Sequence, residues 1–213
     1  MTMTTRPQTA ELSPSVRGRE PEADVEPMFL ERWSRRAFSS RPLSRASLAT
    51  LFEAARWAPS SGNEQPWLFV YAHEPQDLAR LRELLVPGNR VWADRAPVLA
   101  LLFARRASSH GPNRWAPFDA GAAWMALALQ AHQLGLSAHA MGGFYEEKAY
   151  AALGVPESEY QAMAAIAIGY PGDPAGLPEA VRVRERPSGR RAIAQIAVEG
   201  RWGGDEGGVA ERS

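Results

Sequence analysis

The sequence predicts a single domain of the α/β or α+β class, in which helices pack around one sheet. Three observations support this prediction. The chain has 213 residues, which fits one domain of ordinary size. Hydrophobic residues make up 45% and charged residues 23% of it, close to the averages for globular proteins, so there is enough apolar surface for a core. Segments with helical spacing also alternate with short apolar runs that are typical of strands.

The first half of the chain reads as helix, strand, helix, strand. Residues 44–57 carry apolar side chains at helical spacing, with Ser44 as a candidate N-cap and Pro59 as the stop. The apolar run WLFVYA, residues 67–72, predicts a buried strand. Leucines on one face predict a helix from about residue 76 to residue 85, and the run PVLALLFA, residues 97–104, predicts a second buried strand.

The second half contains the predicted central helix. Residues 119–134 are apolar almost all the way round, which indicates a helix buried on most of its faces. Asp119 is the candidate N-cap of this helix, and Gly135 is the candidate residue that closes it in a left-handed conformation. A shorter helix is predicted from about residue 146 to residue 153, ending at Gly154.

Two further strands are predicted near the C-terminus. The run AMAAIAIG, residues 162–169, reads as an interior strand. Residues 192–198 alternate imperfectly between apolar and polar side chains, which is typical of an edge strand or a strand swapped with another subunit.

The two ends of the chain differ in composition from the middle. Residues 1–27 are rich in Thr, Pro, Glu and Arg and hold few large apolar residues, so a disordered tail is predicted. Residues 203–213 have the same character and are predicted to be a flexible tail. The folded domain is therefore expected to span residues 28–202.

Composition excludes several classes of function. The formal net charge is zero, which removes a global electrostatic argument for nucleic acid or an anionic membrane, and an arginine-based nucleic-acid binder is disfavoured. The chain has no cysteine, which excludes disulfides and thiolate chemistry, so any redox activity needs a bound cofactor. The four histidines show no metal-ligand spacing, and no metal site is predicted. No membrane helix or signal peptide is visible, and the expected location is cytoplasmic.

Two polar constellations are candidates for a binding site. The first is the run RWSRR, residues 32–36, whose guanidinium groups and hydroxyl can bind a phosphate, although such a run alone fits a solvated basic loop as well. The second is the run APSSGNEQPW, residues 58–67, which leads directly from a helix into a strand. Its Ser, Asn and Gln side chains offer donors and acceptors suited to the edge of a planar heterocycle.

The order of these runs resembles the N-terminal signature of the nitroreductase family of flavin mononucleotide (FMN) enzymes. RWSRRAF is followed by EAARWAPSSGNEQPW, and further matching motifs are GN at 88–89, DAGAA from 119, MGGF at 141–144, LGVP at 153–156 and IGYP at 168–171. The resemblance covers roughly residues 31–202. It implies a three-layer α+β sandwich with a mostly antiparallel sheet, which a C-terminal arm of the partner subunit completes.

The resemblance also implies which residues bind FMN. Arg32, Trp33, Ser34 and Arg36 match the segment that holds the cofactor. Arg32 and Ser34 are then directed to the phosphate, and Arg36 to the ribityl chain and the N1/O2 side of the flavin ring. A fixed guanidinium there would stabilise the reduced flavin, which carries negative charge near N1 and O2.

The remaining implied contacts lie on three later segments and a C-terminal pair. Asn89 matches an asparagine that reads the pyrimidine edge of the flavin, and the backbone of Gly142 and Gly143 matches the turn that contacts N5. Arg190 and Arg191 lie where family members place basic residues against the phosphate. The loop that the partner subunit lays beside the flavin is matched by Pro59, Ser60, Ser61 and Asn63.

The implied activity is a ping-pong oxidoreductase that works as a homodimer with FMN at the interface. NAD(P)H reduces the flavin at N5 and leaves, and a small acceptor such as a nitroaromatic or a quinone takes its place. No protein nucleophile or general base is needed, so no catalytic side chain is expected. Two alternatives remain open: another reaction on the same fold, such as a dehalogenase, azoline oxidase or flavin-fragmenting enzyme, and a non-catalytic FMN-binding protein.

The aromatic residues allow two interpretations. They could stack over the flavin or its substrate, or they could pack in the core or a dimer interface, which is the more frequent role of such residues. The residues concerned are Trp92, Trp115, Phe118, Trp124 and Phe144.

Overall fold

The structure, a computed structural model, describes residues 18–202 of the 213-residue chain. The described residues divide into two compact units, a core unit of residues 32–186 and a terminal unit formed by residues 18–31 and 187–202. The disorder predicted for residues 1–17 and 203–213 lies outside the described residues. The domain bounds of 28–202 stay a prediction.

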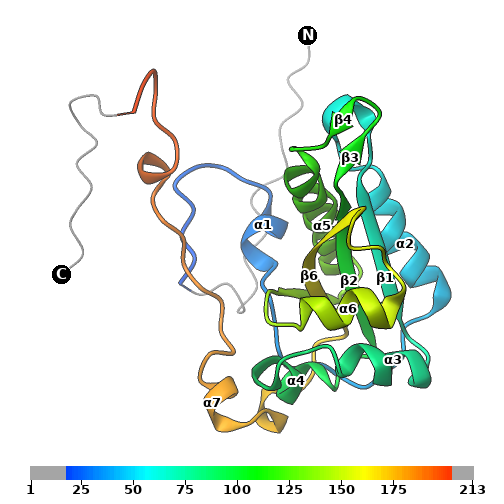
Figure 1. The fold of residues 1–213 in the computed structure, drawn as a ribbon. Helices are drawn as coiled ribbons and strands as arrows, with labels where there is room; N and C mark the ends of the chain where they lie inside the picture. Colours follow the sequence, from blue (N-terminus) through cyan, green and yellow to red (C-terminus); the bar gives the residue numbers. More distant parts are fainter. Residues whose placement is uncertain (1–17, 203–213) are drawn as a thin grey trace. The chain divides into compact units, whose positions relative to one another are not determined.

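The core unit is built on an antiparallel sheet of four strands in the order β1-β2-β6-β5 (Figure 1). In chain order the strands are β1 (Trp67–Ala72), β2 (Val98–Arg105), β5 (Ser137–Met141) and β6 (Tyr160–Gly169). The register places Leu99 opposite Ala167, and Ala167 opposite His139 on β5. This order leaves β1 and β5 as the two edge strands of the sheet, with β2 and β6 buried between them.

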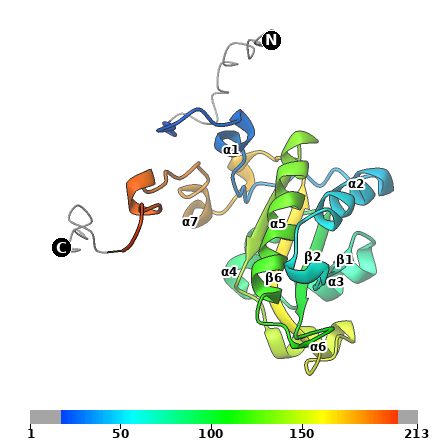
Figure 2. The same ribbon diagram turned by 90° about the horizontal axis from the view of Figure 1, so that it is seen from above.

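Helices cover both faces of this sheet, so the core unit has three layers with the sheet in the middle (Figure 2). One face packs against α2 (Arg45–Arg56) and α5 (Ala116–Gln133), and the other against α3 (Pro75–Arg82), α4 (Pro87–Ala93) and α6 (Glu146–Leu153). Successive residues of β2 alternate between the two clusters, with Leu101 and Phe103 in one and Leu102 and Ala104 in the other. The predicted sandwich of helices around one sheet is confirmed.

Shorter elements join these layers. They are η2 (Ser61–Asn63), β3 (Ala107–Ser108), β4 (Gly111–Pro112), η3 (Pro174–Gly176) and α7 (Glu179–Arg182) in the core unit, with α1 (Pro27–Glu31) and η4 (Ile193–Gln195) in the terminal unit.

The helix α2 follows the sequence pattern closely. Its N-cap is Ser44, whose Oγ accepts a hydrogen bond of 3.0 Å from the backbone N–H of Ser47. Leu48, Leu51 and Ala55 are its buried residues, and they form the stripe that the spacing predicted.

The central helix α5 begins earlier than predicted. The N-cap is Trp115 rather than Asp119, because Pro117 occupies the first turn, where a missing backbone N–H costs nothing. Asp119 lies inside that turn, buried, and its carboxylate contacts a neighbouring loop instead of capping its own helix. The other end is as predicted: Gly135 has a φ of 69°, the left-handed conformation that favours glycine.

Three other predictions differ from the structure. Within this single chain the run 192–198 holds the short turn η4 and not an edge strand, and its apolar residues Ile196 and Val198 are exposed; a strand swapped with another subunit stays a prediction. A strand needs a neighbour to satisfy its backbone, and the described residues offer this segment none. The strand β1 is an edge strand with only Ala72 buried, not the buried strand that its composition suggested. The helix α3 ends at Arg82 rather than near residue 85.

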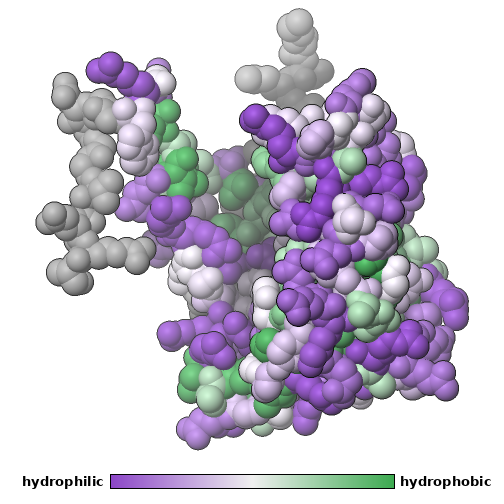
Figure 3. Space-filling model, in the orientation of Figure 1, coloured by the Kyte–Doolittle hydropathy of each residue, from purple (hydrophilic) through white to green (hydrophobic). Residues whose placement is uncertain are grey.

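The helices and the surface of the described residues can be compared with what a membrane protein needs. None of the helices in residues 18–202 is long and apolar enough to cross a membrane. On the face of the core unit shown in Figure 3, hydrophilic residues predominate and hydrophobic ones form small separate groups.

Candidate functional site

The residues 32–37, called the arginine segment below, have no regular structure, and other parts of the core unit satisfy their backbone. The Nδ1 of His139 on β5 lies 2.9 Å from the carbonyl oxygen of Arg35. Glu185 accepts hydrogen bonds from two successive backbone N–H groups, those of Arg36 (2.9 Å to each carboxylate oxygen) and Ala37 (3.0 Å). Two side chains from distant parts of the sequence therefore fix this segment.

The end of the arginine segment is fixed by a close approach of two backbones. Gly172 donates a 2.9 Å hydrogen bond to the carbonyl of Ala37, and Ser39 donates one of 2.9 Å to Tyr170. A Cβ on Gly172 would overlap the carbonyl group of Phe38, so only glycine fits there. The segment is thus anchored to the chain that follows β6.

The side chains of the arginine segment carry positive charge and one unpaired donor. Trp33 is 8% exposed, and its indole Nε1 has no hydrogen-bond acceptor among the described residues. The guanidinium of Arg35 lies 4.4 Å from the centre of the Trp33 ring. Burial lowers the pKa of Arg35 and of Arg36, and the charge of Glu185 opposes this shift in both.

His139 is the contact between the arginine segment and the sheet. Because a carbonyl oxygen only accepts, Nδ1 of His139 carries the proton that the Arg35 carbonyl accepts. Burial lowers the pKa of His139 to about 4, and the positive charges of Arg36 and Arg32 add to this shift. The ring also packs on Trp92 of α4, with centroids 4.6 Å apart.

The pair Gly142–Gly143, called the glycine turn below, directly follows β5 and packs against the first turn of α4. The carbonyl of Gly143 accepts hydrogen bonds from the side chain of Asn89 (3.0 Å) and the backbone of Val86 (3.2 Å). A Cβ on Gly143 would lie 2.6 Å from Asn89 Nδ2 and 2.8 Å from Val86 Cγ2, so a side chain at this position would displace Asn89 and Val86. Three of the predicted site residues, Asn89, Gly142 and Gly143, are therefore brought together.

The loop with the sequence PSSGN, residues 59–63, has an unusual backbone. Gly62, Asn63 and Gln65 have φ values of 58°, 56° and 47°, a left-handed conformation that costs a residue other than glycine about 1–2 kcal/mol. Two contacts hold it: the Oγ of Ser60 accepts from Gln65 N–H (3.0 Å), and buried Asp119 accepts from Ser61 N–H (3.1 Å). Strain maintained in this way is typical of functional loops.

This loop and the glycine turn lie at opposite edges of the sheet. The loop leads into β1, the glycine turn follows β5, and two strands separate them. With a spacing of about 4.8 Å between strands, the two edges are about 14 Å apart. The fold brings the arginine segment, Asn89 and the glycine turn to one edge, but it does not bring the loop to them within one chain.

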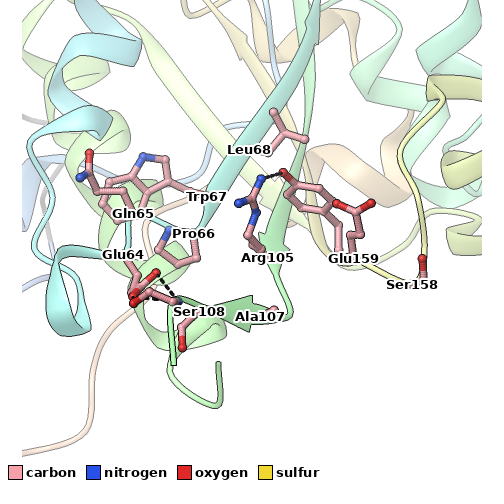
Figure 4. A pocket seen from close by; sticks show the side chains of 12 residues that line it. Glu64, Gln65, Pro66, Trp67, Leu68, Arg105, Ala107, Ser108, Ser158 and Glu159 are labelled. Carbon is pink, nitrogen blue, oxygen red and sulfur yellow. Dashed lines mark hydrogen bonds between the residues drawn. The ribbon is translucent and has the colours of Figure 1, made fainter. Parts of the chain in front are cut away.

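A cavity of about 700 Å³ lies next to this loop, at the end of the sheet where β1 begins, β2 ends and β6 begins (Figure 4). Glu64 lines one side and accepts hydrogen bonds from the backbone and the hydroxyl of Ser109. Arg105 lines the other side and donates to the hydroxyl of Tyr160 (3.1 Å). Hydrogen bonds from Ser109 lower the pKa of Glu64. None of the residues predicted to bind FMN lines this cavity.

The two C-terminal arginines belong to the terminal unit. Arg190 donates to the carbonyls of Ser188 and Gly189 at 3.3 and 2.9 Å, and both Arg190 and Arg191 are exposed. Their contact with the phosphate stays a prediction.

The aromatic candidates divide into core and surface residues. Trp92 is buried and packs between Phe38 and His139. At the start of α5, Phe118 is 76% exposed and Trp115 is 47% exposed.

A family model described as "Nitroreductase: Nitroreductase family" matches residues 30–91 and 85–170, more than half of the chain. The chain belongs to the nitroreductase family. Both the glycine turn and the arginine segment of this nitroreductase-family protein lie within the matched residues, as do Asn89 and the loop 59–63.

This nitroreductase-family chain is also similar to individual proteins along most of its length. A solved structure described as "the oxidoreductase containing FMN" is 44% identical, with a TM-score of 0.83, and the match covers 86% of this chain and 96% of that one. An NADH dehydrogenase of Thermus thermophilus is 29% identical over 186 residues, 72% of this chain and 89% of its own. An "Uncharacterized 15.4 kDa protein in ask 5'region" of Mycolicibacterium smegmatis is 41% identical over 124 residues, 58% of this chain and 82% of its own.

Sequence reasoning missed three residues of the site. Each of them forms a hydrogen bond with the backbone of a predicted binding segment. His139 donates to the carbonyl of Arg35, Glu185 accepts from the N–H of Arg36, and Asp119 accepts from the N–H of Ser61. Asp119 stood in a recognised motif but was assigned to a helix cap. No local pattern marks His139 or Glu185, because their partners lie 104 and 149 residues away in the sequence.

Proposed function

We propose that this protein binds FMN and transfers hydride from NADH or NADPH, through flavin N5, to a small acceptor such as a nitroaromatic or a quinone. The observation that supports the proposal is the convergence of the arginine segment and the glycine turn at the β5 edge, where His139 precedes Gly142 by three residues. A 44% identical structure of an oxidoreductase containing FMN supports the same cofactor. In this proposal the functional domain spans residues 28–202.

The arginine segment fits the phosphate end of FMN. Arg32 and Arg36 supply guanidinium groups, which keep their charge at physiological pH and match the geometry of a phosphate, and Ser34 supplies a hydroxyl. The buried indole N–H of Trp33, which has no acceptor among the described residues, offers a further donor. The donors of this segment are thus suited to an anion with several acceptor oxygens.

The glycine turn fits the flavin ring. Gly142 is exposed, and a Cβ built on it would meet no atom within 4 Å, so the space beside this backbone is open. Asn89 holds the neighbouring Gly143 in place through Nδ2, which leaves its Oδ1 as an acceptor for the ring edge. Bound FMN would supply the hydride chemistry, while the protein orients the ring and stabilises its negative charge.

A homodimer would complete the site. The loop 59–63 cannot reach the glycine turn of its own chain because the two lie at opposite edges of the sheet. A second copy can lay this loop beside the flavin, and the exposed aromatic residues Trp115 and Phe118, close to Asp119 and the loop, would then be covered. The segment after residue 186, with Arg190 and Arg191, is the proposed arm that crosses to the partner.

The decisive experiment is a visible absorption spectrum of the purified protein, with and without added FMN. Oxidised flavin bands that bleach when NADH or NADPH is added without oxygen would support the proposal. Bands that do not bleach would leave an FMN-binding protein without this activity. A protein that stays colourless after incubation with FMN would contradict the proposed binding of FMN and with it the proposed reaction.

A second measurement tests the dimer. Sedimentation equilibrium should give twice the chain mass of 23.3 kDa, and the stoichiometry should be one FMN per chain. A monomer that binds FMN at full stoichiometry would contradict the shared site.

A further inference from the structure

Glu185 is a carboxylate placed beside a cluster of arginines, yet it does not pair with them. Among the described residues it forms no ion pair within 4.0 Å with Arg35 or Arg36, although its charge influences the pKa of both. Its hydrogen bonds go instead to the backbone N–H groups of Arg36 and Ala37.

The geometry of these bonds is specific. One oxygen, Oε1, accepts from both amides, at 2.9 Å from Arg36 and 3.0 Å from Ala37, while Oε2 adds a second bond of 2.9 Å to Arg36. Hydrogen bonds to a charged acceptor are about twice as strong as neutral ones. Because the carboxylate binds the main chain, it does not occupy the guanidinium groups of Arg35 and Arg36.

Glu185 is itself held in place by the core unit. It follows α7, where Val181 is buried, and its own N–H donates 2.9 Å to the carbonyl of Arg182. The neighbouring Arg184 accepts a 3.3 Å bond from the Arg36 guanidinium through its carbonyl oxygen. A short, anchored piece of chain therefore contacts both the backbone and the side chain of Arg36.

We propose that Glu185 is a positioning residue for the cofactor, which fixes the backbone of the arginine segment so that Arg32, Ser34 and Arg36 are ordered before the phosphate arrives. This inference rests on the proposed function. An ordered binding segment loses less conformational entropy when its ligand binds, so its affinity is higher. Without the carboxylate, two partly buried amides lose their acceptor. The segment then becomes ordered only when FMN binds, and the entropy lost in that step lowers the affinity for FMN.

Three substitutions separate the backbone contact from the charge. Glu185→Ala removes both and should weaken FMN binding about tenfold or more. Glu185→Gln keeps the length and an oxygen that can accept from both amides, and should lose clearly less affinity than Glu185→Ala. Glu185→Asp keeps the charge but is one methylene shorter, and should lose affinity almost as Glu185→Ala does. Asp173→Ala is the matched control, since Asp173 also accepts from a backbone amide, that of Ala175 (2.8 Å), in an exposed turn.

Two readouts distinguish this inference from the proposed function. Fluorescence titration of the full-length apoprotein with FMN gives the dissociation constant, and turnover at saturating FMN should change far less than this constant. Hydrogen exchange of the Arg36 and Ala37 amides in the apoprotein should accelerate in Glu185→Ala, a result that needs no FMN at all.

The outcomes are separate. A wild type that does not bind FMN contradicts the proposed function, while the exchange data still test the contact. A wild type that binds FMN, with Glu185→Ala equally tight or with Glu185→Asp tighter than Glu185→Gln, would overturn the positioning role. If Glu185→Ala does not fold, the order of the Gln and Asp variants decides the question.

Discussion

Acid should destabilise the folded protein through His139. The folded-state pKa of this histidine is lowered from 6.5 to about 4 by burial, with Arg36 and Arg32 adding to the effect. Between these two values the unfolded chain binds the proton and the folded one does not, so stability is fully present above pH 6.5 and is lost as the pH falls toward 4. The shift corresponds to about 3 kcal/mol, since one pKa unit is about 1.4 kcal/mol.

The assay is urea unfolding, followed by tryptophan fluorescence at a series of pH values from 4 to 8, for the wild type and for His139→Asn. Asparagine keeps a donor near the position of Nδ1 for the Arg35 carbonyl but has no proton to gain. The free energy of unfolding should fall more steeply in the wild type. The difference between the two curves should grow by up to about 3 kcal/mol between pH 6.5 and pH 4.

Using the difference between variants removes the contribution of carboxylates, which titrate in both proteins. His110→Asn serves as the control, because this histidine is exposed in the β3–β4 hairpin. Parallel curves for the wild type and His139→Asn across this range would refute the reasoning, because they would mean that the buried ring is not kept neutral by the fold.

Two further substitutions test the backbone contacts of the site. Gly172→Ala should lower the free energy of unfolding by more than about 2 kcal/mol in thermal melts, because its Cβ would overlap the carbonyl of Phe38. Gly121→Ala in α5 is the control. A Cβ there would meet no atom within 4 Å, so this variant should be neutral or stabilising in the same melts. Equal effects of the two substitutions would show that the backbones of Gly172 and Phe38 do not lie in close contact. Asp119→Ala should cost about 1–3 kcal/mol and speed hydrogen exchange at Ser61, since that amide loses its acceptor; unchanged exchange would show that Asp119 does not hold the loop.

The elements that the sequence predicted well are those whose signals are local. Ser44 caps α2 because its hydroxyl reaches a backbone N–H three residues on, and Gly135 and Gly154 end their helices because glycine adopts a positive φ without strain. The strand at residues 67–72 was predicted with the bounds that the structure has. For the helix ends the deciding contacts lie within a few residues, whereas β1 was recognised from its local apolar composition although it forms by pairing with the distant strand β2.

The elements that were missed or misread depend on distant contacts. The helix α4 contains Pro87 and Gly88, which are turn residues by composition, and it forms because Trp92 and Ala93 are buried under the sheet. The strand β5 has no apolar alternation, and its histidine, His139, is buried in contact with Arg35 and Trp92. Composition also could not show that β1 lies at an edge.

For the site, the sequence by itself determined which residues are candidates, because the arginine run, the PSSGN loop and the glycine pair are ordered motifs that resemble one family. Only the tertiary structure decided which of them meet. Strand order places the glycine turn and Asn89 beside the arginine segment and the loop at the opposite edge, and no single sequence reveals that order. The supporting carboxylates, Glu185 and Asp119, acquire their roles from backbone groups 149 and 58 residues away, which a local pattern cannot indicate.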